Sequence, residues 1–273
     1  MKKLIPAFFV VMILATGCPQ PETEIQQVEI GLFTPYVLFP EILNGKVKEV
    51  VETNYLGIEQ DGKIMKGERL TIDARDSIKW SPDFKLIFDD NGNVLQTLYL
   101  DENDEVVKKD VQTVMEGKIV KSETIKGDTL RNYAKFSYNE SGHLTAIEVY
   151  KLPVDTLAWG ALLTVDEQGN YQEWQVMDEK GSPTDKYMFT VNQEDRRTGY
   201  KYYNKEGELA FEERYTYNEM GFMSKQEMIN KEGEASASEY LYEYDEQDNW
   251  VKVTGNSDQY TIITERKITY FTE

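Results

Sequence analysis

The side chains that most often carry catalytic or metal-binding chemistry are scarce in this sequence. Its 273 residues include one cysteine, Cys18, and one histidine, His143. Zinc sites draw on several such residues, and Ser-His or Cys-His catalysis requires a histidine beside its nucleophile. His143 directly follows Gly142 in a segment typical of a turn, where a histidine is normally solvated. We therefore expect no metal site, no cofactor and no histidine-dependent catalysis.

Carboxylates are the abundant reactive group, with 49 Asp and Glu residues. Two carboxylates about 5 to 9.5 Å apart can hydrolyse a glycoside, but so many acids form such pairs by chance, and no motif singles one out. The segment that begins at Asp89 is not an EF-hand loop, because Gly92 comes too early and Leu100 stands where the final glutamate belongs. We therefore predict that the protein is not an enzyme.

The N-terminus has the three parts of a secretory signal. Lys2 and Lys3 are followed by an apolar run over residues 4–14 and then by small residues before Cys18. This segment resembles the bacterial lipobox, with Ala15 at the position where leucine is most frequent. The resemblance implies that the signal is cleaved, that Cys18 is lipidated, and that the lipid holds the protein on a membrane.

The chain therefore divides into three predicted parts. Residues 1–17 form the cleaved signal peptide, residues 18–30 the lipidated cysteine with a flexible tether, and residues 31–273 a single repeat β domain. Pro19 rather than aspartate follows the cysteine, so nothing marks the protein for the inner membrane. We expect a lipid anchor in the outer membrane of the bacterial cell envelope, on its periplasmic or its surface side.

Charge excludes one class of partner. The chain carries 30 Lys and Arg against 49 Asp and Glu, a net charge of −19. A nucleic-acid-binding protein needs a basic face that displaces the counterions of the phosphates. Nucleic acid is therefore not expected as a partner.

From about residue 84 onward the chain repeats a short turn unit. The unit is an aromatic or apolar residue, then Asp or Asn, two polar residues and Gly. Asn218 can accept a hydrogen bond from the backbone and begin a type I turn, and Gly221 can then take the left-handed conformation that closes a hairpin. Aspartate tolerates positive φ and replaces the glycine at three turns. These replacements are Asp104, Asp195 and Asp248.

Side chains between the turns alternate in polarity. Tyr215 and Tyr217 share one parity, while Arg214 and Thr216 share the other. A period of two between tight turns predicts antiparallel strands. We predict an all-β fold, a long antiparallel meander of roughly 14–18 strands in one twisted, coiled sheet that forms an open shell or a barrel. A membrane-spanning barrel is disfavoured, because Lys and Glu crowd the face opposite the aromatic one.

The repeat resembles a known family over roughly residues 84–255. Tyr242-Glu243-Tyr244-Asp245 followed by Asn249-Trp250 is the closest match to the YD-repeat (RHS-type) family and to related short repeat lipoproteins. Elsewhere Asn often replaces the Asp, and the family's Gly-Arg pair is absent. The resemblance implies a fold built of β-hairpins and no particular activity.

Two surfaces are candidate binding sites. Because successive turns alternate between the two ends of the sheet, many acids gather at one end and could bind cations or a basic partner. The acids of this predicted rim are Asp89, Asp90, Asp166, Glu167, Asp195, Asp245, Glu246 and Asp248. The alternative is that they only cap turns. Trp159 lies in the apolar segment 151–165 and is either an exposed aromatic contact or part of a buried strand pair near Pro153. The apolar segment 31–43 is expected to cover an open edge of the sheet.

These observations favour a non-catalytic lipoprotein that binds or scaffolds an unknown protein or glycan in the cell envelope. An immunity or antitoxin-like repeat protein is the alternative, since similar short repeats occur in such proteins. A glycan hydrolase is the least favoured of the three.

Overall fold

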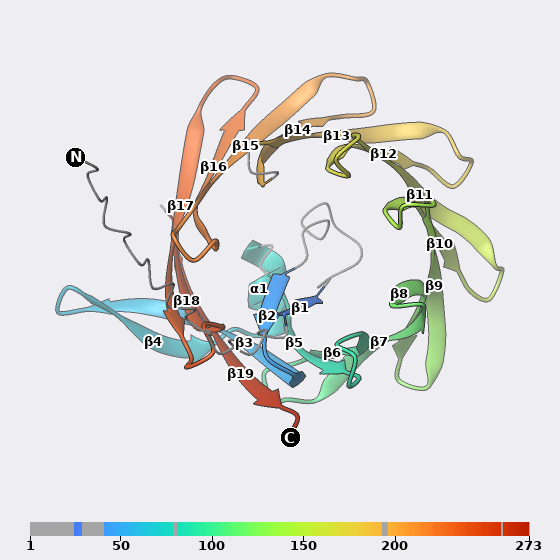
Figure 1. Cartoon of the computed structure of the whole chain (residues 1–273). Coiled ribbons are helices and arrows are strands. Elements are labelled where there is room, and N and C mark those ends of the chain that lie inside the picture. Colours follow the sequence, from blue (N-terminus) through green and yellow to red (C-terminus); the bar gives the residue numbers. More distant parts are fainter. Residues whose placement is uncertain (1–24, 29–40, 79–80, 193–195, 258, 273) are drawn as a thin grey trace, which may run out of the picture.

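The computed structural model describes residues 25–28, 41–78, 81–192, 196–257 and 259–272 (Figure 1). Cys18 lies outside the described residues, as do Asp195 and most of the segment 31–43. The prediction of a signal peptide, a tether and one repeat domain therefore stays a prediction.

Sixteen antiparallel strands form a closed barrel, which confirms the predicted coiled meander and decides between an open shell and a barrel. The strands follow one another around the wall in chain order, and β19 closes the circuit by pairing with β3, from Ile262 opposite Leu56 to Tyr270 opposite Val47. The strands are β3 (Val47–Gln60), β5 (Asp83–Phe88), β6 (Val94–Leu100), β7 (Val106–Met115), β8 (Lys118–Lys126), β9 (Thr129–Tyr138), β10 (Leu144–Lys151), β11 (Thr156–Val165), β12 (Tyr171–Met177), β13 (Pro183–Val191), β14 (Arg197–Tyr203), β15 (Leu209–Tyr217), β16 (Met223–Asn230), β17 (Ala235–Tyr244), β18 (Trp250–Ser257) and β19 (Thr261–Tyr270).

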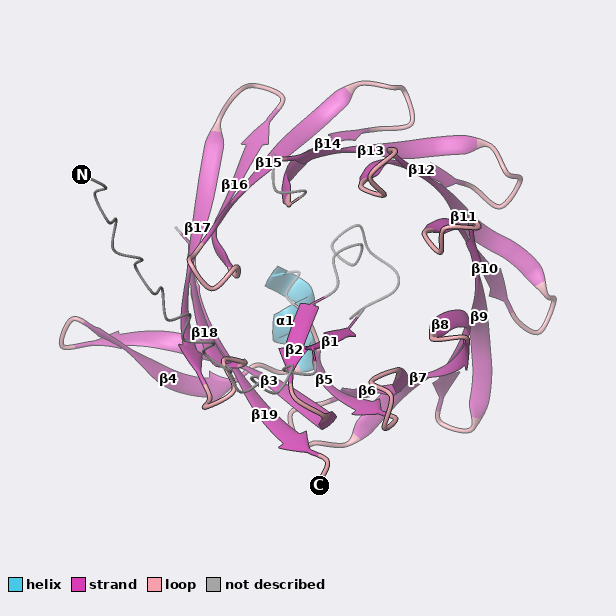
Figure 2. Ribbon diagram, in the orientation of Figure 1, coloured by secondary structure: helices cyan, strands magenta, loops and turns pink. Residues whose placement is uncertain are grey.

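Four further elements belong to the N-terminal part. The long strand β3 pairs with β5 through residues 49–52 and with β4 (Lys63–Arg69) through residues 55–60, so β3 and β4 extend from the wall as a ribbon (Figure 1). The helix α1 (Ile72–Ile78) follows β4 and was not expected from the sequence. In the view down the barrel, α1 and the pair β1 (Ile25–Val28) and β2 (Glu41–Asn44) lie within the ring (Figure 2).

The hairpin turns have the predicted chemistry. Gly221 has φ of 88°, its N–H donates to the carbonyl of Asn218 at 3.0 Å, and the Asn218 side chain accepts from the N–H of Phe222 at 2.9 Å. The aspartates that replace glycine also have positive φ, 66° at Asp104 and 61° at Asp248. The turn unit therefore specifies where each strand of the wall ends.

The aromatic and apolar face of the sheet is the inner face. Leu43 of β2 is buried in one cluster with Val50 of β3 and Leu86 of β5, so these wall residues point toward the interior (Figure 1). Neighbouring residues of a strand point to opposite faces, which places Glu49 and Lys85 on the outside. A larger inner cluster runs along the wall from β8 to β15. Its buried members include Ile119, Phe136, Ile147, Leu163, Trp174, Phe189, Tyr200 and Tyr215.

Candidate functional site: a cationic cavity beneath helix α1

A cavity of about 660 Å³ lies between α1 and the adjoining wall strands β6, β7 and β8. Four apolar side chains line part of it. They are Ile72, Pro82, Leu100 and Val107. Tyr99 and four charged side chains line the rest. The charged ones are Arg75, Asp76, Lys108 and Lys126. Three of these four charges are positive, which distinguishes the cavity from a chain that is acidic as a whole.

A polar group on the inner wall supports the cavity. The Tyr99 hydroxyl donates to Asp110 Oδ2 at 2.8 Å, and the Thr124 hydroxyl donates to Asp110 Oδ1 at 2.7 Å. The Lys108 ammonium lies 3.6 Å from the centre of the Tyr99 ring, a cation–π contact. These residues lie on the neighbouring strands β6, β7 and β8, with Tyr99 directly opposite Lys108 and Asp110 directly opposite Thr124.

Burial shifts the acid–base properties of two of these groups. Burial lowers the pKa of the Lys108 ammonium, and the negative charge of Asp110 acts in the opposite direction. Burial and the neighbouring Asp110 carboxylate raise the pKa of the Tyr99 hydroxyl well above its usual range. Tyr99 therefore stays a neutral hydrogen-bond donor, and Lys108 is a cation that has lost much of its hydration.

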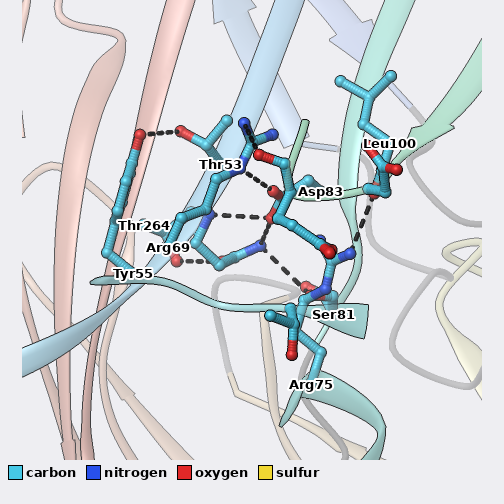
Figure 3. A network of polar contacts seen from close by, with 12 residues as sticks. Thr53, Tyr55, Arg69, Arg75, Ser81, Asp83, Leu100 and Thr264 are labelled. Carbon is cyan, nitrogen blue, oxygen red and sulfur yellow. Dashed lines mark hydrogen bonds and ion pairs between the residues drawn. The ribbon is translucent and has the colours of Figure 1, made fainter. Parts of the chain in front are cut away.

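Asp83 fixes α1 against the wall (Figure 3). Its carboxylate is fully buried and binds Arg75 Nη1 at 2.7 Å and Arg69 Nε at 2.7 Å. It also accepts hydrogen bonds from the backbone N–H and the side-chain amide of Asn54, at 3.0 and 2.8 Å. Arg75 Nη2 also donates a hydrogen bond to the carbonyl oxygen of Leu100 at 3.0 Å. The helix is therefore held at the point where β3 changes partner from β5 to β4, and the cavity lies under it.

Aromatic rings line the inner wall on the far side of the barrel from β3 and β5. The ring centres of Tyr187 and Tyr202 are 5.0 Å apart, and those of Tyr202 and Phe211 are also 5.0 Å apart. Trp174 and Tyr200 join the same series, which crosses strands β12 to β15. Such cross-strand aromatic pairs add to sheet stability and leave an apolar surface facing inward.

Ion pairs cover the outer wall. Lys85 binds Glu49 at 2.6 Å, and Lys252 binds Glu243 at 2.6 Å, in each case between neighbouring strands. The pairs recur around the barrel. The others include Lys121–Glu123, Lys186–Glu173, Lys201–Glu212, Arg214–Glu227, Lys225–Glu227 and Lys66–Glu265. Their side chains are partly or largely exposed, so the outer face carries charges of both signs.

The described acids of the predicted rim, which exclude Asp195, lie in turns at one end of the barrel, opposite the end that holds the turn of Gly233. These are the turns after β5, β11 and β17. Asp89, Asp166 and Asp245 each accept hydrogen bonds from backbone N–H groups two and four residues ahead in their own turns. Among the described residues, no three His, Cys, Asp or Glu side chains converge into a group that could hold a metal ion. Binding at this rim stays a prediction.

Trp159 lies on the inner face of β11. It is directly opposite Val149 of β10, is half-buried, and packs against the larger inner cluster. The two strands are joined by a turn that contains a cis Leu152–Pro153 bond. The segment thus forms a strand pair with an irregular turn, and Trp159 contributes to the inner wall.

Sequence reasoning missed the cavity, although one signal for it is present. Lys108 and Asp110 occupy alternate positions of β7 that face the barrel interior. Two charged residues are unusual at such inward-facing positions. Arg75 gives no such signal, because a short helix inside a barrel cannot be inferred from the hairpin pattern.

Comparison with known proteins gives the fold. No protein-family model and no curated protein sequence matches this chain. A porin-like protein from Bacteroides uniformis ATCC 8492 superposes with a TM-score of 0.54 at 7% identity, over 82% of this chain and 96% of that one. A porin-like protein from Bacteroides vulgatus ATCC 8482 gives a TM-score of 0.35 at 9% identity, over 83% and 99%.

The structure of TcdB2-TccC3 without its hypervariable C-terminal region gives a TM-score of 0.16 at 12% identity. It covers 82% of this chain and 15% of that one. Within the described residues, no helix is long and apolar enough to cross a membrane. The superposition on the Bacteroides uniformis protein, with its TM-score of 0.54, shows that the chain shares the β-barrel fold of that porin-like protein.

Proposed function

We propose that this protein is a cell-envelope lipoprotein whose barrel stands in water and binds an apolar or amphiphilic small molecule without catalysis. The lipid on Cys18 anchors it, and the outer membrane is the expected site of the anchor. The observation that carries the proposal is the polarity of the wall, which is charged outside and aromatic or apolar inside.

The outer face is unsuited to lipid. A membrane-spanning barrel presents an outward apolar band about 25 Å tall, and a Lys or Arg at its midplane costs about 2–4 kcal/mol. Here the outward residues at the middle of the strands form ion pairs, such as Lys201 with Glu212 and Arg214 with Glu227. Paired in water, such side chains cost little. The ion pairs therefore support a barrel wall that is surrounded by water.

The inner face is suited to an apolar ligand. Tyr187, Tyr202 and Phe211 are half-buried, so their rings still present surface inside the wall. Small-molecule sites are mostly apolar and aromatic, with a few polar groups that fix orientation. The cavity beneath α1 supplies polar groups of that kind.

In this proposal the YD-repeat resemblance accounts for the fold and for no activity. The turn of Asn218 and Gly221 and the aromatic parity of the strands build a wall of hairpins. We propose that this chain uses such hairpins to form a small closed barrel, with no activity implied by the repeat itself.

Binding of a fluorescent apolar probe to a matched pair of variants tests the proposal. The full chain with Cys18→Ala, taken from the soluble fraction without detergent, is titrated with N-phenylnaphthylamine. We expect binding that Tyr202→Ser weakens and Tyr203→Ser leaves unchanged, because Tyr202 contacts Phe211 on the inner face whereas Tyr203 lies beneath Lys186 on the outer face. Circular dichroism corrects for the folded fraction. A protein that aggregates without detergent, or that binds no probe, would refute the proposal.

The lipid anchor has its own test. Metabolic labelling with a fatty-acid probe should label the wild-type protein and leave Cys18→Ala unlabelled, with loss of membrane attachment or stalled processing. Equal labelling of both proteins would show that Cys18 is not the site of lipidation.

A further inference from the structure

In the part of the chain that the structure describes, the two lysines of the cavity lack the ion pairs that several outer-wall lysines form. Lys85 and Lys252, for example, each lie 2.6 Å from a glutamate oxygen. Among the described residues, Lys108 and Lys126 form no ion pair, although the chain has 49 acidic residues against 30 basic ones. Lys126 is exposed at the end of β8, whereas Lys108 is half-buried against Tyr99.

The two buried carboxylates of this region, Asp110 and Asp83, are already engaged. Both oxygens of Asp110 accept hydrogen bonds, one from Tyr99 and one from Thr124. Asp83 is held by Arg69 and Arg75. Asp76 is exposed on α1. The Lys108 ammonium is thus partly desolvated in the cavity. The nearby buried carboxylate, Asp110, accepts its hydrogen bonds from the neutral hydroxyls of Tyr99 and Thr124.

Partial burial of the Lys108 ammonium costs folding free energy. The negative charge of Asp110 and the Tyr99 ring offset part of this cost, and a bound anion would offset more of it. The guanidinium of Arg75 is committed to Asp83 and Leu100, so the ammonium groups are the donors that remain for an anion. Beside them, Ile72, Pro82 and Val107 provide apolar surface in the same cavity.

We propose that the cavity beneath α1 binds the anionic headgroup of an amphiphile, a carboxylate or a phosphate monoester, through Lys108 and Lys126. The apolar chain of the ligand lies on the apolar lining of the same cavity. A cavity of about 660 Å³ falls within the range of small-molecule sites, roughly 300–1,000 Å³. This inference rests on the proposed function and names its ligand class.

Titration calorimetry with ligands that differ only in the headgroup tests the inference. The full chain with Cys18→Ala is titrated with decanoate, decyl phosphate, decanol and decyltrimethylammonium. We expect decanoate and decyl phosphate to bind about tenfold to a hundredfold more tightly than decanol and decyltrimethylammonium. A hydrogen bond between a charged donor and acceptor contributes a difference in affinity of about that size. Lys108→Met should remove this preference. Lys109→Met is the matched control, because Lys109 follows in the same strand and points outward, and it should keep the preference.

The outcomes separate the two proposals. Equal binding of all four ligands would overturn the headgroup site and leave the apolar binding function standing. Absence of binding by any of them, together with no binding of the naphthylamine probe, would overturn both. Inorganic phosphate is titrated as a further arm. Binding of phosphate as tight as that of decyl phosphate would overturn the amphiphile and identify a site for the free anion. Loss of the preference in Lys109→Met as well would show that net charge, and not the cavity, selects the anion.

Discussion

At the scale of single residues, the buried carboxylate of Asp83 forms ion pairs with two arginines. Asp83 is fully buried between Arg69 and Arg75, whose side chains are 16% and 3% exposed. Buried ion pairs seldom add net stability compared with apolar packing, but removing one partner leaves an uncompensated charge. The network therefore serves to hold α1 and β4 in one arrangement, which in turn keeps the cavity open under the helix.

Replacing Asp83 tests this role. We expect Asp83→Asn to lower the free energy of unfolding by about 3–5 kcal/mol, because Arg75 would stay buried without a counter-charge. Denaturant unfolding measures the change. Glu265→Gln is the control, since the Lys66–Glu265 pair is 45% and 34% exposed and should be worth about 0–1 kcal/mol. Equal effects of the two substitutions would contradict the structural role of Asp83.

A second residue-scale prediction concerns acid stability. Hydrogen bonds from the N–H groups of Ser182 and Lys180 hold the pKa of the Asp178 carboxyl below its usual range. A carboxyl whose pKa is lower when folded adds stability that is complete above its unfolded pKa of about 3.9 and is lost as the pH falls through the folded value.

Asp178→Asn should remove this acid-sensitive contribution. Asparagine already plays the same part at Asn204, whose side chain accepts from the N–H groups of Glu206 and Glu208 at 3.1 and 2.9 Å. The two proteins should therefore have similar unfolding midpoints near neutral pH, and the wild type should lose more stability between about pH 5 and pH 2. Parallel curves over that range would show that the turn carboxylate is not linked to folding.

At the scale of elements, the hairpin turn sets the length and register of each strand. Gly221 has φ of 88°, in the left-handed region, and the strand register shifts by a bulge between Thr216 and Tyr217 just before the turn. Because the turn unit recurs, the same local geometry repeats along the wall and keeps one face of every strand inward.

Two substitutions at one turn test this geometry. Gly221→Val should destabilise the protein by on the order of 1–2 kcal/mol or more, because a β-branched residue is strained at positive φ. Gly221→Asn should cost much less, since asparagine tolerates that region. Chemical denaturation compares the midpoints, and equal midpoints for the two variants would refute the role assigned to this glycine.

At the scale of the whole molecule, the described acids of the predicted rim lie in turns at one end of the barrel, while the turns at the other end also carry acids such as Asp101 and Glu206. Turns at the same end are two strands apart, about 9–10 Å, which is close to the Debye length of about 8 Å in physiological salt. Their mutual repulsion is therefore only partly screened, and the end with the predicted rim should present a negative potential. The carboxylates of Asp89, Asp166 and Asp245 meanwhile cap their own turns.

Calcium titration decides whether the rim also binds cations. We expect weak heat in the millimolar range that falls when Asp245, Glu246 and Asp248 are changed to Asn or Gln. The same changes at Asp178 and Glu179, which lie at the other end, are the control. No heat, or heat that the rim variant retains, would leave these acids as turn caps alone.

Much of the wall follows from the sequence because its causes are local. An aspartate or asparagine followed by glycine closes a turn within five residues, and alternation sorts Tyr215 from Arg214 onto opposite faces. The strand count, the antiparallel order and the positive φ of Asp104 and Asp248 all rest on such short-range rules.

Closure and the cavity depend on residues far apart in the chain, which only the tertiary structure brings together. Tyr270 pairs with Val47, and Asn54 meets both Asp83 and Thr264, contacts that no turn unit encodes. Whether a twisted sheet closes depends on the register accumulated over all its strands. The cavity depends further on where α1 docks, because residues of α1 and Lys108 of β7 line the same space and Asp110 is oriented by Tyr99 and Thr124.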